Sequence, residues 1–190
     1  MNNLLKTPKK GDIEKYKQNF KPLERDSGKH ADVFIVTSDH SPFSKTLKKE
    51  ERKYAVKRQE IKDPKKKSDK AYREVRIFHH LKQLQEKNEC FNFVQLKDWV
   101  KTNSSSLPFS DEEEMDTGKD EQITFMLMVL EYGGEPLANM KSMNCRQFIS
   151  VVFQVIFALH IAQKYFSFVH HDLHSKNILL KKIQGTNFLV

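Results

Sequence analysis

The sequence has little cysteine: two residues, Cys90 and Cys145, in a chain of 190. Two isolated cysteines provide neither a disulfide framework nor a CxxC metal motif, and they favour a reducing compartment. The first six residues lack the apolar core of a signal peptide. The most apolar stretch, Phe148 to Ala162, contains a glutamine and a histidine and is shorter than the roughly 20 residues that cross a bilayer. These absences favour an intracellular protein with no membrane partner.

The composition is that of a soluble, globular and basic protein. Apolar residues make up 38% of the chain and include 14 phenylalanines, which is enough for a core. The length allows one or two domains. The net charge of +8 suits polyanionic partners such as nucleic acid. Many of the lysines fall in expected loops, however, where a solvated basic surface is the simpler explanation.

Short β-branched and aromatic runs predict strands in the first part of the chain. The run from Ile123 to Leu130 is apolar throughout and predicts a central strand, which Glu131-Tyr132-Gly133-Gly134 ends. Residues 178–180 and 188–190 predict a hairpin. The other expected strands cover residues 31–36, 54–56 and 93–100.

Two helices are expected, over residues 69–87 and 144–166. The second is apolar on nearly every side, which places it in the middle of a domain. The first has an apolar stripe that includes an acidic residue, Glu74. A carboxylate on an apolar face is costly unless it is paired, and Lys57 on the preceding strand is the expected partner. The alternative is that Glu74 lies at the edge of the stripe and faces water.

Two segments lack such patterns. Residues 1–19 are polar and lysine-rich, and we expect them to form a mobile leader. Residues 102–121 combine three consecutive serines with the acidic run from Asp111 to Glu114. This low-complexity composition predicts a disordered loop.

A polar loop before the C-terminal hairpin carries the most informative pattern. It runs from His170 to Asn177 and sets Asp172 and Asn177 five residues apart. This H-x-D-L-x-x-x-N spacing resembles the catalytic loop of protein kinases. The order of the other expected elements over residues 20–190 also resembles that of a kinase: a strand with a lysine, a helix with a glutamate, further strands, a Gly-Gly turn and an apolar helix.

Within the protein kinase superfamily, the sequence is most similar to haspin-like serine/threonine kinases. His174 follows Asp172 and Leu173 where common kinases have lysine, and Glu131 to Gly134 resembles the haspin hinge. The resemblance implies an α+β, protein-kinase-like two-lobe fold. The antiparallel-sheet N-lobe with one main helix would cover residues 20–130, the hinge 131–135, and a truncated, mainly helical C-lobe 136–190.

The resemblance also implies that ATP and Mg²⁺ are the cofactors. Lys57, in the Tyr54-Ala55-Val56-Lys57 strand, would bridge the α- and β-phosphates and pair with Glu74. Backbone groups of Glu131 and Gly133 would hydrogen-bond to adenine. The apolar side chains expected around the adenine ring are those of Val33, Ala55 and Leu179.

The glycine-rich loop is the least complete motif. If Val33 covers adenine, Gly28 is the one glycine that matches G-x-G-x-x-G-x-V, because Asp26 and Ala31 occupy the outer positions. Glycines there would let backbone N–H groups approach the phosphates, and a carboxylate at position 26 would weaken triphosphate binding. The alternative is an ordinary hairpin in another register.

In the catalytic loop, the resemblance makes Asp172 the base that accepts the substrate proton and Asn177 the metal ligand. His174 would lie near the transferred phosphate, where a neutral imidazole offers one hydrogen-bond donor and its protonated form offers a charge. His170 is expected to pack beneath the loop, and His171 replaces the arginine that grips an activation-loop phosphate. Zinc binding is a weaker alternative, because adjacent histidines seldom converge on one ion.

Residues 178–190 contain no aspartate or glutamate, although a kinase carries its second metal-binding aspartate after this hairpin. We therefore expect the 190-residue chain to be a truncated kinase domain without activity of its own. The parent activity would be transfer of the ATP γ-phosphate to serine or threonine. The haspin resemblance favours a histone-tail threonine as substrate and a nuclear location.

Two functions of other classes remain as alternatives. One is a catalytically silent pseudokinase that acts as a binding module. The other is a basic nucleic-acid module, which the sequence supports little because it lacks an aromatic-basic recognition motif. No sequence-specific nucleic-acid binding is therefore expected.

Overall fold

The structure, a computed structural model, describes most of the chain. The leader predicted for residues 1–19 lies outside the described residues, and so does the disordered loop predicted for residues 102–121, except for residues 102 and 103. The prediction is wrong for these two residues, which continue the strand Leu96–Asn103. The described residues are 20–27, 31–38, 53–63, 65–66, 68–103, 123–182 and 188–189.

The chain divides into two compact units. Unit 1 comprises Met1–His79 and Leu96–Tyr132, and unit 2 comprises His80–Gln95 and Gly133–Val190. The division after Tyr132 falls inside the expected hinge. Residues 80–95, which the sequence suggested as part of the N-lobe, belong to unit 2 in this division.

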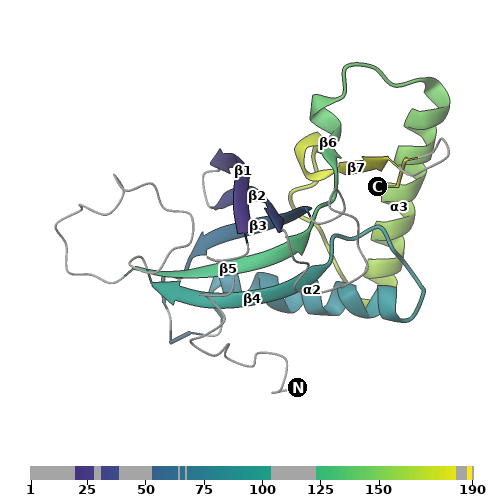
Figure 1. Ribbon diagram of the computed structural model, residues 1–190. Helices are drawn as coiled ribbons and strands as arrows, with labels where there is room; N and C mark the ends of the chain where they lie inside the picture. Colours follow the sequence, from purple (N-terminus) through teal and green to yellow (C-terminus); the bar gives the residue numbers. More distant parts are fainter. Residues whose placement is uncertain are drawn as a thin grey trace. The chain divides into compact units, whose positions relative to one another are not determined.

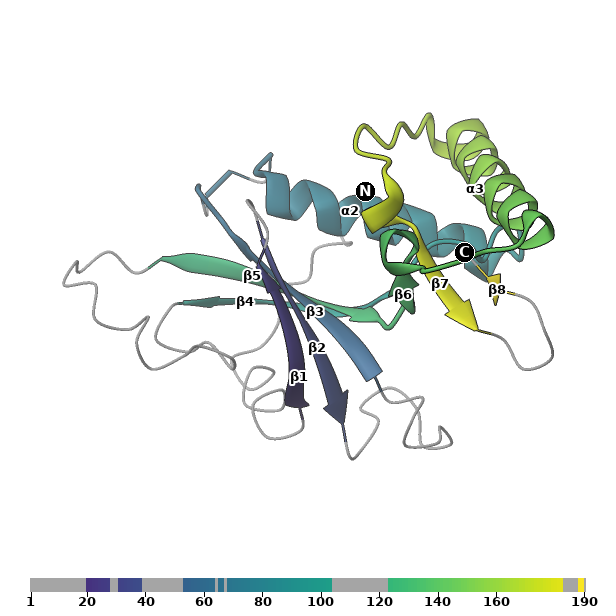
Figure 2. The same ribbon diagram turned by 90° about the horizontal axis from the view of Figure 1, so that it is seen from above.

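Unit 1 is built on a five-stranded sheet with the order β1-β2-β3-β5-β4, in which all neighbours are antiparallel (Figures 1 and 2). This confirms the expected α+β class and its antiparallel sheet. β1 was not predicted from a run of its own, because charged residues interrupt its apolar pattern. The strands are β1 (Phe20–Ser27), β2 (Asp32–Ser38), β3 (Lys53–Glu60), β4 (Leu96–Asn103) and β5 (Thr124–Glu131).

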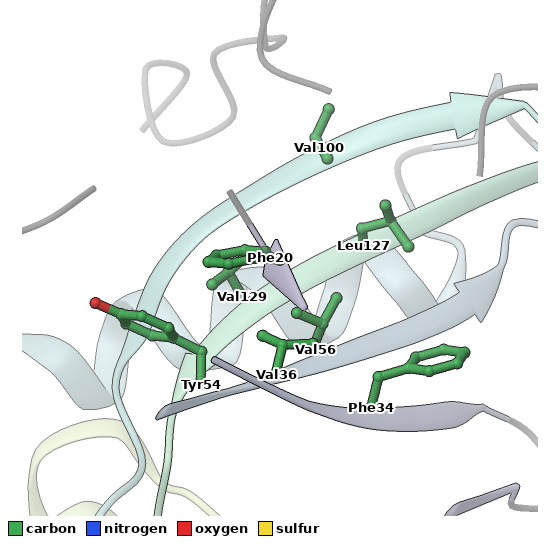
Figure 3. Close-up of a cluster of buried hydrophobic side chains, with 8 residues drawn as sticks. All are labelled: Phe20, Phe34, Val36, Tyr54, Val56, Val100, Leu127 and Val129. Carbon is green, nitrogen blue, oxygen red and sulfur yellow. The ribbon is translucent and has the colours of Figure 1, made fainter. Parts of the chain in front are cut away.

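Alternate side chains of these strands gather in one buried cluster (Figure 3). β3 contributes Tyr54 and Val56, whereas Ala55 and Lys57 point to the other face, because successive side chains of a strand alternate. Burying an apolar side chain of this size stabilises the fold by about 1.5–3 kcal/mol. The cluster consists of Phe20, Phe34, Val36, Tyr54, Val56, Val100, Leu127 and Val129.

Helix α2 spans Lys70–Glu86, one residue shorter at each end than predicted. Asp69 precedes it, and its Oδ1 accepts the backbone N–H of Ala71 at 2.9 Å. This bond satisfies one of the free donors of the first turn. The predicted apolar stripe is buried at Ala71, Val75 and Leu84, which are each 0% exposed.

Helix α3 spans Cys145–Phe166, within one residue of the prediction. It starts with a capping box, in which the side chains of Asn144 and Gln147 each accept the other's backbone N–H. The prediction that this helix lies buried in the middle of a domain is wrong. Its buried residues form a single stripe, and its other faces expose large apolar side chains. The buried residues are Val151, Ala158 and Ala162, and the exposed ones are Phe148, Ile149, Val152, Phe153, Ile156, Phe157 and Tyr165.

The buried stripe of α3 packs within unit 2. Small alanines let a helix approach its neighbour closely. Two side-chain hydrogen bonds also tie α3 to the segment after α2: Asn92 Nδ2 donates to Gln154 Oε1 at 2.9 Å, and the Tyr165 hydroxyl donates to Glu89 Oε1 at 2.7 Å. The apolar cluster consists of Leu81, Leu84, Cys90, Ala158 and Ala162.

Among the helices that the structure describes, α3 alone has the length and composition to cross a membrane. Its most apolar window is 17% buried. The core helix of a soluble protein meets the same criteria of length and composition. The hydrogen bonds of Gln154 and Tyr165 show that α3 is part of the fold of unit 2, and the absence of a membrane partner stays a prediction.

The remaining strands of unit 2 form a small sheet with the order β6-β7-β8. The hairpin predicted near the C-terminus is present, because β7 and β8 pair antiparallel, with Lys181 opposite Leu189. β6 was not predicted, since two residues carry no periodicity. The elements are β6 (Glu135–Pro136), β7 (Leu179–Lys182), β8 (Phe188–Leu189) and two 3₁₀ turns, η4 (Leu137–Asn139) and η5 (Ser175–Asn177).

Candidate functional site

In unit 1, Lys57 and Glu74 meet as predicted. Lys57 lies on β3, and its Nζ donates to Glu74 Oε1 on α2 at 2.5 Å. The two side chains are 26% and 23% exposed, so the pair is partly buried and joins the sheet to the helix. The alternative, in which Glu74 faces water away from Lys57, is wrong.

The other predicted adenine-site residues of unit 1 lie on the strands around Lys57. Val33 is opposite Lys57 in the β2–β3 ladder, and Ala55 is opposite Leu130 in the β3–β5 ladder. Directly opposed residues share a face of a sheet, so Val33, Ala55 and Lys57 are presented on one side. At the end of β5, the Glu131 side chain forms an ion pair with Lys97 at 3.6 Å, and the assignment of its backbone carbonyl to adenine stays a prediction.

The β1–β2 pairing places Asp26 beside the valine expected to cover adenine, and the match to the glycine-rich loop stays a prediction. Asp26 is opposite Val33, and Ser27 is opposite Asp32, in the antiparallel ladder. Gly28 lies outside the described residues. Because Asp26 shares the face of Val33, its carboxylate lies on the side of the sheet that carries Lys57, which agrees with the unfavourable position inferred from the sequence.

In unit 2, Gly133 and Gly134 lie close against β7. Gly134 has a φ of +96°, and a Cβ there would lie 2.1 Å from the carbonyl oxygen of Leu180. A Cβ at Gly133 would lie 2.6 Å from Cδ1 of Leu179. Gly134 is therefore required both by the close approach of β7 and by its backbone conformation, whereas a Cβ at Gly133 would require the Leu179 side chain to shift. Gly133 and Leu179, which are both predicted to contact adenine, lie next to each other.

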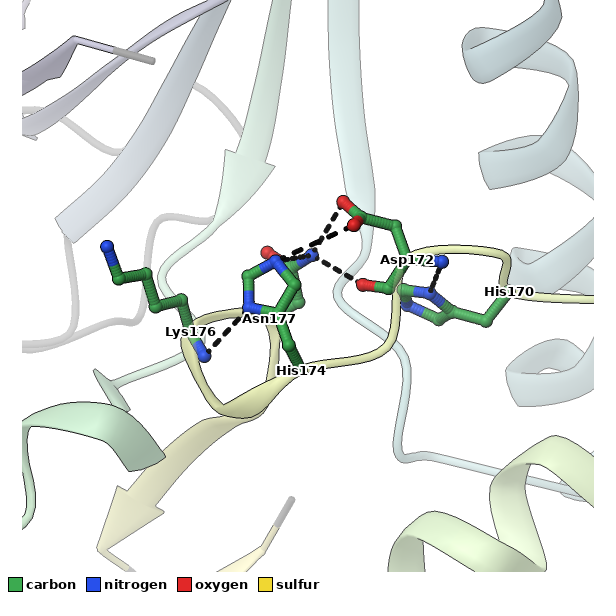
Figure 4. A network of polar contacts seen from close by, with 5 residues as sticks. All are labelled: His170, Asp172, His174, Lys176 and Asn177. Atoms are coloured by element: carbon green, nitrogen blue, oxygen red, sulfur yellow. Dashed lines mark hydrogen bonds and ion pairs between the residues drawn. The ribbon is translucent and has the colours of Figure 1, made fainter. Parts of the chain in front are cut away.

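Asp172 and Asn177 are joined by hydrogen bonds (Figure 4). Asn177 Nδ2 donates to the backbone carbonyl of Asp172 at 2.9 Å and to its carboxylate Oδ2 at 3.2 Å. These bonds close the loop into a ring between the two residues and fix the carboxylate. The amide donors of Asn177 are directed at Asp172, so its Oδ1 is the atom that can bind a metal ion.

His174 begins the turn η5, and its Nδ1 accepts the backbone N–H of Lys176 at 3.2 Å (Figure 4). A neutral imidazole that accepts at Nδ1 carries its hydrogen on Nε2. Nε2 lies 3.8 Å from Asp172 Oδ1 and 3.1 Å from Asn177 Nδ2. The tautomer of His174 decides whether Nε2 accepts a hydrogen bond from Asn177 Nδ2 or offers a donor to an anionic group.

The two preceding histidines support the loop. Nδ1 of His170 accepts the backbone N–H of Asp172 at 3.4 Å, and its ring lies edge-on to Phe168 with centroids 6.1 Å apart. His170 thus contacts the loop and Phe168, which packs against the apolar cluster of unit 2, and its position in the core beneath the loop stays a prediction. His171 has a φ of +60°, in the left-handed region that non-glycine residues rarely adopt. Such strain, of order 1–3 kcal/mol, persists where neighbours fix the backbone, often at active sites.

The side chains of this loop are suited to Mg²⁺, which prefers oxygen ligands. Asn177 Oδ1 is the oxygen donor expected to hold the ion, and the Asp172 carboxylate is the expected base. In the described part of the chain, no three His, Cys, Asp or Glu side chains converge to hold a metal ion. The zinc alternative therefore has no support in those residues.

One buried polar contact of unit 1 was missed from the sequence. Arg58, next to Lys57, is 7% exposed and forms an ion pair with Asp32. A cationic residue at an inward position of a strand is the signal that could have revealed it, because a buried charge needs a partner.

The family model described as "Haspin like kinase domain" matches residues 94–189, half of the chain. The chain belongs to the haspin-like kinase family. The matched region contains the loop with Asp172 and Asn177 and the pair of glycines before β6. It does not contain Lys57 or Glu74.

Two curated relatives support the assignment to the haspin-like kinase family. A serine/threonine-protein kinase haspin homolog of Drosophila melanogaster is 31% identical over 90 residues, which cover 47% of this chain and 15% of the relative. A probable serine/threonine-protein kinase of Dictyostelium discoideum is 41% identical over 69 residues, 30% of this chain and 5% of the relative. The haspin-like chain thus spans a small share of each relative.

The solved structure of the PK-1 kinase of Cydia pomonella granulovirus resembles this haspin-like chain with a TM-score of 0.53 and 14% sequence identity. The similarity covers 95% of this chain and 55% of the viral chain. At this identity it shows the fold alone, which is that of a protein kinase over part of its length.

Proposed function

We propose that this chain is the nucleotide-binding part of a haspin-like serine/threonine kinase, which transfers the γ-phosphate of ATP to a hydroxyl group. The observation that carries the proposal is the hydrogen-bonded pair of Asp172 and Asn177 in the region that matches the family. The ion pair of Lys57 and Glu74 supports the proposal independently. The pair lies outside the region that matches the family, and a lysine held by a glutamate suits the binding of phosphate groups.

Each residue has a defined role in this proposal. The Asp172 carboxylate, oriented by Asn177, accepts the proton of the substrate hydroxyl. Lys57 binds phosphate oxygens, and Glu74 holds the ammonium group in place. His174 Nε2–H donates a hydrogen bond to a phosphate oxygen. Asn177 would hold Mg²⁺, which would supply neutralisation of the charge on the phosphates.

We further propose a protein substrate, a histone-tail threonine, and action in the nucleus. The support is membership of the haspin-like family and similarity to a protein named as a haspin homolog. A panel of peptides that compares a histone-tail threonine with serine and with valine at the same position tests this. Equal labelling of unrelated peptides would contradict the substrate assignment.

Nucleotide binding is tested first, by calorimetry with ATP in the presence and absence of Mg²⁺. The unaltered chain should bind MgATP. Lys57→Met should weaken binding about tenfold, a change of about 1.4 kcal/mol. The matched control is Lys101→Met on β4, a lysine at the far edge of the same sheet, which should leave the affinity unchanged. An unaltered chain that binds no MgATP would contradict the proposal.

The 190-residue chain is expected to bind ATP without transferring phosphate. The reason is that residues 178–190 contain no carboxylate to serve as a second metal ligand beside Asn177. Transfer of radiolabelled phosphate to a histone-tail peptide measures this, with Asp172→Asn as the active-site variant. Activity of the 190-residue chain that Asp172→Asn abolishes would overturn the expectation.

The carboxylate of Asp26, at a glycine position of the glycine-rich loop and opposite Val33, favours one second candidate, a pseudokinase that serves as a binding module. Such a module would give no phosphate transfer in any length of the gene product. A longer product that phosphorylates a peptide in a manner dependent on Asp172 would exclude it.

A further inference from the structure

An ion cluster around the buried Arg58 adjoins the strand position of Lys57. Arg58 Nε donates to Asp32 Oδ2 at 2.9 Å, and Arg58 Nη2 donates to the same oxygen. Arg25 Nη2 lies 3.7 Å from that oxygen. One carboxylate on β2 thus binds guanidinium groups from β1 and from β3.

Two aromatic rings enclose the buried guanidinium. Arg58 Cζ lies 5.4 Å from the ring centroid of Phe34 and 5.6 Å from that of Phe125. Arg25 Cζ lies 5.5 Å from the same Phe34 ring. A planar guanidinium suits this environment, because it can stack on rings while its N–H groups bind a carboxylate.

The position of the cluster in the β2–β3 ladder connects it to the proposed site. Asp32 is opposite Arg58, and the next pair along the ladder is Val33 opposite Lys57. A shift of β2 against β3 by one residue would turn Val33 to the other face. It would also separate Arg58 from Asp32 and leave two buried charges unpaired, which is strongly unfavourable.

We propose that the Arg58–Asp32 pair, with Arg25, is a positioning element that holds Lys57 in place on β3 for the phosphates of the bound nucleotide. The proposal rests on the proposed function. It makes Arg58 a positioning residue, since its side chain points to the opposite face from Lys57 and acts through the strand that both residues share. Apolar side chains could fill the same space, but they lack the directional bonds that specify one register.

The test measures the affinities of MgATP and of adenosine for each variant. Lys57 contacts phosphate in the proposed site, so a displaced Lys57 lowers the affinity for ATP more than that for adenosine. Arg58→Met and Asp32→Asn should each weaken ATP binding about tenfold and change adenosine binding less than about twofold. A purely structural role would change both ligands alike. Lys101→Met serves as the control and should change neither.

A double-mutant cycle identifies the path of the effect. In the Lys57→Met background, Arg58→Met should cause no further loss of preference for ATP over adenosine, because the group it positions is absent. Additive losses would overturn the proposal. If Arg58→Met does not fold, Arg25→Met, which removes the more exposed arm of the cluster, should show the same selective loss to a smaller extent, and no selective loss would overturn the proposal.

The two proposals fail in different ways. If the unaltered chain binds neither ATP nor adenosine, the nucleotide-binding function is wrong. If it prefers ATP, and Arg58→Met and Asp32→Asn keep that preference while Lys57→Met abolishes it, the positioning role is wrong and the nucleotide-binding function stands.

Discussion

Strand β5 and helix α3 are both built largely from apolar residues, yet they are covered to opposite extents. In β5, Met126 and Met128 are 0% exposed. In α3, Phe153 is 68% and Ile156 is 61% exposed. A strand must pair its backbone with a neighbouring strand, and β5 pairs with both β3 and β4. A helix satisfies its backbone hydrogen bonds internally and can form with one stripe covered.

The comparison shows that the apolar side chains of an element predict that it will pack against another part of the protein. They do not identify which segment that is. In the described residues, α3 is covered by the end of α2 and the segment after it. The exposed remainder is a contiguous apolar surface of a kind that marks an interaction site or an aggregation hazard.

The largest expected effect is a loss of stability on truncation of a buried side chain of β5. Leu127→Ala removes a side chain that is 2% exposed in β5 and should lower the free energy of unfolding by about 2–5 kcal/mol. Phe153→Ala, on the exposed face of α3, should change it by less than about 0.5 kcal/mol and reduce self-association. Urea unfolding followed by fluorescence reports on unit 1, because Trp99 on β4 is the sole tryptophan. Equal losses in the two variants would contradict the comparison.

The second test asks whether unit 2 is loosely packed in general. Gly134→Ala should destabilise the protein by roughly 3 kcal/mol, because the new Cβ would meet the Leu180 carbonyl oxygen in an unfavourable backbone conformation. Gly133→Ala meets the end of the Leu179 side chain, which can rotate, and should cost about 1 kcal/mol. The difference in melting temperature between the two variants is the measurement. Two small and equal shifts would show that the close approach to β7 is not needed.

The third test concerns the ion pair that joins sheet and helix in unit 1. Glu74→Gln keeps the size of the side chain and removes its charge, and it should destabilise the protein by about 1–2 kcal/mol. This lies below the roughly 3–5 kcal/mol of a fully buried pair, because the side chains of Lys57 and Glu74 are 26% and 23% exposed. The control is Glu86→Gln, which breaks an exposed pair with Lys82 and should have no measurable effect. A loss for Glu74→Gln as small as that of the control would contradict the prediction.

The smallest expected effect is a difference in reactivity between the thiols of the two cysteines. Cys90 is 1% exposed in the cluster beneath α3, and burial raises the pKa of its thiol. Its folded pKa lies above the unfolded one, so the stability it contributes is present at neutral pH and is lost as the pH rises through the folded value. A thiol reagent at pH 8 should therefore modify Cys145 rapidly and Cys90 only after denaturation. Rapid modification of both in the native protein would show that α3 is not packed over Cys90.

Much of the local structure could be predicted from patterns of short range. The helices at 70–86 and 145–166 and the strand at 124–131 follow from periodicity and from capping residues such as Asn144. The catalytic loop could be recognised because its residues are close in sequence, with Asp172 and Asn177 five positions apart. The partner of Glu74 could be predicted because an acidic residue in an apolar stripe requires a cation.

Other features depend on which segments meet in space. No periodicity marks β6, and the glycine pair before it gives no sign that β7 approaches so closely. The contact of Arg58 with Asp32 joins residues 26 positions apart, and either residue alone suggests a solvated charge. The exposure of α3 was predicted wrongly. The sequence shows which faces of the helix are apolar, but it does not show whether another segment packs against them.

The sequence by itself determined the family, the helices and main strands, and the chemical groups of the candidate site, since these depend on residue identity and spacing along the chain. The tertiary structure decided the register of β2 against β3, the packing of the two glycines on β7 and the face of α3 that is covered. These depend on side chains from distant segments, whose burial and pairing are settled only when the segments are brought together.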